Sequence, residues 1–109
     1  MLDRLEKTEA LLDAMEQELP FKVRLTPELI AGLARQERPL AVKPIETVTK
    51  ISYAGDEGGI MCHIAPSDTK SIFVVSLTHL RVPRILPFSA AAHAYQKHRA
   101  KKLKKQNSL

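Results

Sequence analysis

Alternation of apolar and polar residues begins at Ile45 and continues, interrupted by two loops, to about Val82. The loop at residues 54–59 holds three glycines and two acids, and the loop at residues 66–70 begins with a proline. A period of two residues is the repeat of a β-strand, and short loops of this composition connect antiparallel neighbours. The pattern therefore predicts a three-stranded antiparallel meander with strands at 45–53, 60–65 and 71–82.

The pairing of these strands is predicted from the side chains that it brings together. We place Tyr53 opposite Ile60, and we place Ile64 opposite Ile72, so that one face collects apolar residues as a core face should. The other face then also carries apolar side chains, which a face turned to water would not. These side chains form a predicted interface of Met61, Phe73, Val75 and Leu77. A helix of the same chain, a second subunit or a ligand would have to cover it.

Helical patterns flank the meander. An amphipathic helix is expected from a cap at Asp3 to about Glu18, with an apolar stripe through Leu5 and Leu12, and it packs on its own domain or pairs in a dimer. Thr26 and Pro27 predict the start of a second helix, to about residue 35. Residues 21–25 fit a short strand at a sheet edge or an extended link. A third helix is expected from a cap at Ser89 to about residue 105. The predicted fold class is α+β, with the three-stranded antiparallel meander packed by two N-terminal helices and one C-terminal basic helix.

Charge is divided unevenly along the chain. Residues 1–68 hold 8 Lys and Arg against 12 Asp and Glu, whereas residues 69–109 hold 9 Lys and Arg and no acid. The densest part of the acid-free stretch is the end of the last helix, and phosphate backbones favour such an arrangement through counterion release. The predicted nucleic-acid-binding residues are Lys97, Arg99, Lys101, Lys102, Lys104, Lys105, Arg81 and Arg84. A basic tail that only keeps the protein in solution is the plainer alternative.

Catalytic and metal-binding patterns are not evident. Cys62 and His63 are neighbours on a predicted strand, so their side chains point to opposite faces and cannot act as nucleophile and base. His93 and His98 are five residues apart on a helix, which turns them away from one another. Cys62 is the single cysteine, which excludes an internal disulfide. We expect no cofactor, no metal and no enzymatic activity.

The sequence as a whole favours a small accessory protein that binds nucleic acid, or another polyanion, through its basic C-terminal helix. A homodimeric interaction module that uses the apolar sheet face is the alternative. We expect a single domain over residues 1–96, and a basic helical extension with a frayed tail over residues 97–109. A membrane partner is not expected, because the basic helix lacks an apolar face. A lone thiol without an export signal favours a cytoplasmic location.

Overall fold

The computed structural model describes residues 3–67 and 70–107. Its elements follow in the order α1 (Leu5–Gln17), β1 (Phe21–Leu25), α2 (Pro27–Arg35), β2 (Ile45–Tyr53), η1 (Gly55–Glu57), β3 (Ile60–Ala65), β4 (Phe73–Ser76), η2 (Leu77–His79), β5 (Leu80–Arg81) and α3 (Ser89–Asn107), where η1 and η2 are 3₁₀ turns. The α+β class is confirmed. The last two residues of the predicted frayed tail lie outside the described residues.

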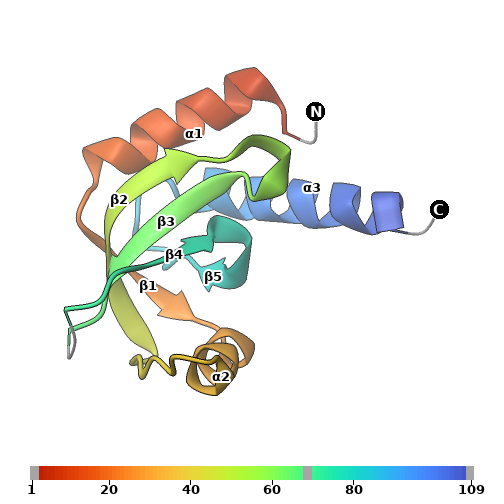
Figure 1. The fold of residues 1–109 in the computed structure, drawn as a ribbon. Helices are drawn as coiled ribbons and strands as arrows, with labels where there is room; N and C mark the ends of the chain where they lie inside the picture. The colour runs from red at the N-terminus through yellow and green to blue at the C-terminus, as the bar shows by residue number, and fades with distance from the viewer. Residues whose placement is uncertain (1–2, 68–69, 108–109) are drawn as a thin grey trace.

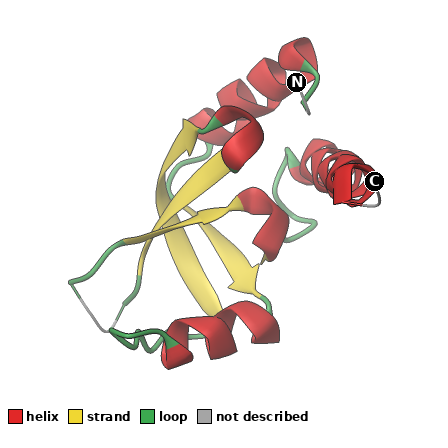
Figure 2. Ribbon diagram, turned by 45° about the vertical axis from the view of Figure 1, so that its right-hand side comes forward, coloured by secondary structure: helices red, strands yellow, loops and turns green. Residues whose placement is uncertain are grey.

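The sheet has five strands, so the prediction of a three-stranded sheet was wrong. All neighbours are antiparallel and the order is β4-β3-β2-β1-β5. Five strands lying flat would place the two edges about 19 Å apart, but the chain from Ser76 to Leu80 reaches at most about 14 Å. The sheet must therefore curl, and it forms the half-barrel seen in Figures 1 and 2. β1, expected at an edge, lies between β2 and β5.

A β-bulge in β2 changes which side chains face the core. The predicted pair of Tyr53 with Ile60 is confirmed, and the same register places Ile51 opposite Cys62. Ile64, however, pairs with Val48, because the register shifts around Thr49. The bulge puts an extra residue into the strand and inverts the alternation beyond it. Val48 is therefore buried on the same face as Ile51, which strict alternation would have placed opposite.

The pairing of β3 with β4 differs from the prediction by one residue. Cys62 pairs with Val75 and Ile64 pairs with Phe73, rather than with Val74 and Ile72. Since the side-chain period of a strand is two, this slip exchanges its two faces. Val75 becomes buried, whereas Val74 is 48% exposed. The predicted third strand also ends early, because the hydroxyl of Ser76 accepts a hydrogen bond from the Thr78 N–H and starts η2.

The helices surround the open side of the half-barrel: α1 lies along its upper end, α2 at its lower end and α3 across the opening (Figure 2). α2 begins as predicted, with the Thr26 hydroxyl accepting from the Leu29 N–H at 3.2 Å and proline in the first turn. α1 departs from the prediction at its cap position, which is Arg4, and at Thr8, which is buried together with the apolar residues Leu11 and Met15. Leu5, predicted to lie in the apolar stripe, is 52% exposed.

Among the described residues, no helix combines the length and the apolar character that crossing a membrane requires.

Candidate nucleic-acid interface

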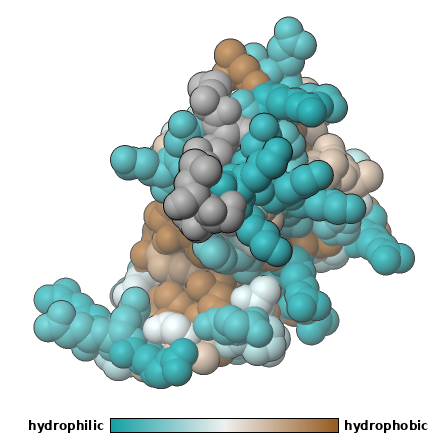
Figure 3. Space-filling view, turned by 90° about the vertical axis from the view of Figure 1, so that its right-hand side faces the viewer, coloured by the Kyte–Doolittle hydropathy of each residue, from teal (hydrophilic) through white to brown (hydrophobic). Residues whose placement is uncertain are grey.

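The C-terminal half of α3 presents most of the predicted cationic residues to solvent. Lys97, Lys101, Lys102, Lys104 and Lys105 are exposed. At about 100° of rotation per residue, Lys97, Lys101 and Lys104 share one side of the helix, which we call the lysine row. Lys102 and Lys105 project from other sides. Hydrophilic side chains predominate over the upper half of the molecule on the side toward which α3 runs (Figure 3).

Arg99 is the exception among the predicted phosphate ligands, because its side chain is only 3% exposed. Its Nη1 donates to both carboxylate oxygens of Asp3, at 3.0 and 3.1 Å, and its Nη2 donates to the Asp56 carbonyl at 2.7 Å. Asp3, predicted as a helix cap, is instead the buried counterion of this arginine. The prediction that Arg99 contacts phosphate was therefore wrong, and the residue anchors α3 to the N-terminus and to the β2–β3 loop.

Both tyrosines of the chain complete this buried network. The hydroxyl of Tyr53 donates to Asp3 at 2.7 Å, and that of Tyr95 donates to Asp3 at 3.1 Å while accepting from the Ile60 N–H. Burial, followed by the hydrogen bond to Asp3 and its charge, raises the pKa of Tyr53 to about 12. Burial raises the pKa of Tyr95 to about 12 as well, with the charge of Asp3 adding to it. The phenols therefore stay protonated at neutral pH. Among the described residues, every buried polar side-chain atom of the network has a hydrogen-bond partner.

Gly59 makes room for the network. Its φ of +67° is in the left-handed region, and a Cβ at this position would meet the Tyr95 hydroxyl and lie 3.0 Å from the Arg99 guanidinium. Only glycine combines this conformation with so close an approach. The glycine-rich loop predicted as a hairpin turn thus has a second role, which is to hold the anchor of α3.

Three arginines gather beside the N-terminal half of α3, around a cleft of about 620 Å³. Arg24 of β1 and Arg81 of β5 are directly opposite on neighbouring strands, and Arg84 follows β5. His93 of α3 closes the cleft, and its Nε2 lies 3.2 Å from the Val82 carbonyl. Among the described residues no carboxylate lines this arginine cleft, which consists of Arg24, Arg81, Arg84 and His93.

The lysine row leads away from the arginine cleft along α3. Lys97 lies one turn beyond His93 and about 40° from it around the helix, and Lys104 lies about 16 Å further along the axis than His93 and about 20° from it. The structure thus brings together Arg81, Arg84 and three of the predicted lysines on one side of the molecule. Sequence reasoning missed Arg24 and His93, although Lys22 and Arg24 alternate with buried residues in β1.

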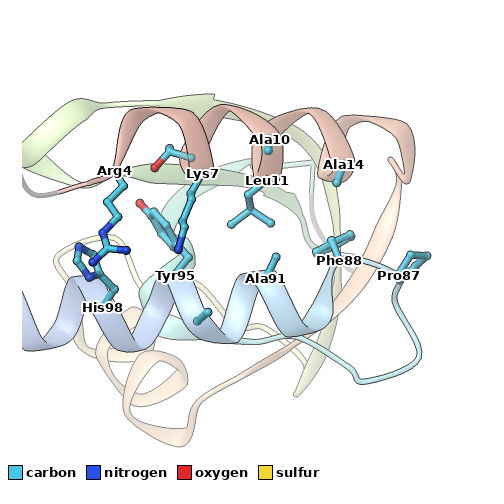
Figure 4. A pocket seen from close by; sticks show the side chains of 12 residues that line it. Arg4, Lys7, Ala10, Leu11, Ala14, Pro87, Phe88, Ala91, Tyr95 and His98 are labelled. Atoms are coloured by element: carbon cyan, nitrogen blue, oxygen red, sulfur yellow. The ribbon is translucent and has the colours of Figure 1, made fainter.

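A second groove, of about 650 Å³, separates α1 from α3. Its floor contains Leu11, Phe88 and Tyr95, and small side chains form its walls. Figure 4 shows Arg4 and Lys7 reaching from α1 toward α3 at one end of the groove, where His98 also lies.

The residues of the predicted interface do not form one exposed face. Leu77 is fully buried and Val75 is 8% exposed, while Phe73 packs partly buried against the core. Met61 alone points to the other face, beside the turn at Gly58. The correction follows from the one-residue slip of β4, which replaces these residues on the outer face by Ile72 and Val74, 63% and 48% exposed.

The other reactive side chains that the structure describes stand as single groups. Cys62 is fully buried, and burial raises the pKa of its thiol to about 12, so the thiolate is not accessible at neutral pH. The Nε2 of His63 shares a hydrogen bond of 2.9 Å with the Ser52 hydroxyl on the sheet surface. Within residues 3–67 and 70–107, no three His, Cys, Asp or Glu side chains are grouped as a metal site would require.

The sequence matches no protein-family model, and comparisons with the curated proteins and with the solved structures found no match.

Proposed function

We propose that this chain is a small non-enzymatic accessory protein that binds nucleic acid through the phosphate backbone. The observation that carries the proposal is the pairing of Arg24 with Arg81. Like charges directly opposite on antiparallel strands are destabilising, and no acid among the cleft-lining residues offsets them. A polyanion in the cleft would remove this repulsion.

The lysine row extends the cationic surface to the length that a nucleic acid requires. Its span from His93, about 16 Å, corresponds to about five phosphates of one strand at 3.4 Å each. The lysines lie on a helix whose position is fixed by the buried contacts of Arg99, so little ordering of the backbone is needed on binding. Contacts of this kind are made to phosphate and carry little base specificity. Nucleic acid in the cytoplasm is the partner that we propose.

The proposal is tested by the salt dependence of binding to labelled duplex DNA, duplex RNA and single strands. We expect affinity to fall steeply with salt, and the triple variant K97Q/K101Q/K104Q to reduce the slope of log K against log salt by about 2–3 for duplex DNA. The variant R35Q/R38Q/K50Q is the matched control, because it removes equal charge at exposed positions elsewhere. Flat salt dependence, or equal effects of the two variants, would refute the proposal.

A second candidate function is homodimerisation through β4, favoured by the state of this strand. β4 pairs only with β3 among the described strands, and residues 71–77 contain no charge, proline or glycine. Edge strands are usually protected by such residues. An antiparallel second copy would bring exposed Ile72 and Val74 into contact with their counterparts.

Light scattering should then report a dimer, and the variant V74K should dissociate it. The control variant I85K, which changes a 90% exposed apolar residue outside the sheet, should leave the dimer intact. A monomer at all concentrations would exclude this candidate.

A further inference from the structure

The arginine cleft differs from the lysine row in geometry. The lysines lie along an exposed helix, whereas Arg24, Arg81 and Arg84 belong to two strands and a turn and line the same cleft. Their side chains make no hydrogen bond or ion pair with any described residue. The cleft therefore brings together three cations that have no side-chain partner within the described part of the chain.

The frame that carries these arginines is itself well held. Arg24 and Arg81 are in the paired part of the sheet, and the turn that contains Arg84 is closed by a backbone hydrogen bond of 3.1 Å from the Leu86 N–H to the Pro83 carbonyl. The Ser89 hydroxyl at the start of α3 donates to the Arg84 carbonyl at 3.2 Å. A rigid support of this kind favours a site for a compact anion over a diffuse basic surface.

The number of cations indicates which anion fits. An internal phosphodiester has one negative charge and two free oxygens. A terminal phosphomonoester carries about −1.5 to −2 charges at pH 7 and three acceptor oxygens. Each arginine can present a planar pair of N–H donors to such oxygens. Three arginines around one cleft match the charge and the oxygens of a monoester better than those of a diester. A diester is better matched by a row of cations that follows a continuous backbone.

We infer that the arginine cleft binds the terminal phosphate of a nucleic-acid strand, and that the lysine row binds the phosphates that follow it. This inference rests on the proposed function and adds a preference for phosphorylated ends. His93 is the junction between the two parts, since it lines the cleft and stands one helical turn before Lys97.

The experiment compares one labelled single strand in three forms: with a 5′-phosphate, with a 3′-phosphate and with hydroxyl groups at both ends. We expect phosphate at one of the two ends to strengthen binding about tenfold, and R24Q/R81Q to abolish this gain. The same double variant should also weaken binding of the unphosphorylated strand, because it removes two cations from the surface, but by a smaller factor than for the phosphorylated strand. Both arginines are exposed, so the variant should fold, which circular dichroism checks.

The matched control is K97Q/K101Q, which removes equal charge from the lysine row. It should weaken binding of all three strands and leave the gain from phosphorylation in place. If all three strands bind equally and with steep salt dependence, the inference is overturned while the proposed function stands. If none binds at low salt, both are overturned.

Discussion

Replacing Arg99 with leucine tests whether the buried ion pair with Asp3 holds α3 in place. The substitution leaves a carboxylate whose side chain is completely buried, with the two tyrosine hydroxyls as its remaining donors. It also removes the donor to the Asp56 carbonyl. Removing one partner of a buried pair costs about 3–5 kcal/mol, because the other charge is left uncompensated.

That cost is large for a chain of 109 residues. The free energy of unfolding of an ordinary domain is about 5–15 kcal/mol. At about 4 °C per kcal/mol for a chain of this size, the melting temperature of Arg99→Leu should fall by about 12–20 °C. Urea unfolding followed by far-ultraviolet circular dichroism gives the corresponding free energy. Lys97→Leu, an exposed change on the same helix, should stay within about 0.5 kcal/mol of the parent.

A double-mutant cycle separates the interaction energy of the ion pair from the free energy lost through packing. Asp3→Leu alone leaves the guanidinium buried without its counterion, so it should cost about as much as Arg99→Leu. In the double variant neither charge remains, and the loss should be smaller than the sum of the single losses by about 1–3 kcal/mol. If the two losses simply add, or if Arg99→Leu costs less than about 1 kcal/mol, the network does not anchor the helix and the reasoning is refuted.

Three further predictions concern the same elements. Tyrosinate absorbance of the native protein should appear only near pH 12, because both phenols have a raised pKa; as the unfolded chain ionises from about pH 10, stability should be complete below pH 10 and fall as the pH rises toward 12. Gly59→Ala should cost about 1–3 kcal/mol more than Gly55→Ala, because both have positive φ but only Gly59 adjoins other side chains; equal losses in urea unfolding would contradict this. Arg81→Thr should raise the free energy of unfolding by about 0.2–1 kcal/mol by removing the repulsion of Arg24, whereas a loss of stability would show that the pair is not repulsive.

Local signals in the sequence predicted the local structure well. Thr26 and Pro27 set the start of α2, and Pro66 marks the end of β3, because capping and proline geometry act over a few residues. The pairing of β2 with β3 across the glycine-rich loop was also predictable from Tyr53 and Ile60, since a short hairpin fixes its own register.

Pairings that depend on a single inserted residue were not predictable. Nothing in the sequence marks Thr49 as a bulge, and Ile72 and Phe73 are equally apolar, so the two registers of β4 look alike until a core is present. The break at η2 depends on the Ser76 hydroxyl, which could equally have continued a strand. As a result, the sequence pattern suggested two apolar faces where the folded sheet has one core face and an exposed edge strand.

The buried network was beyond sequence reasoning for a different reason. Asp3 and Arg99 are separated by almost the whole chain, and each has an ordinary local explanation, as a helix cap and as one cation in a basic run. Only tertiary contact shows that one arginine in the run is unlike its neighbours. Tyr53 and Tyr95 likewise show no shared pattern until Asp3 lies between them.

A count of the cations along α3 therefore overstates how many of them are exposed, because Arg99 is buried. The count also gives no sign that this arginine holds the helix in place. The lysine side chains extend into solvent, whereas the guanidinium of Arg99 donates hydrogen bonds to three oxygen atoms inside the protein. Because that anchor fixes the rotation of α3, it also fixes which lysines share the side of His93 and the arginine cleft. The cationic surface thus depends on two kinds of residue: exposed cations, to which the proposed function assigns the contacts with the anion, and one buried cation that determines where they lie.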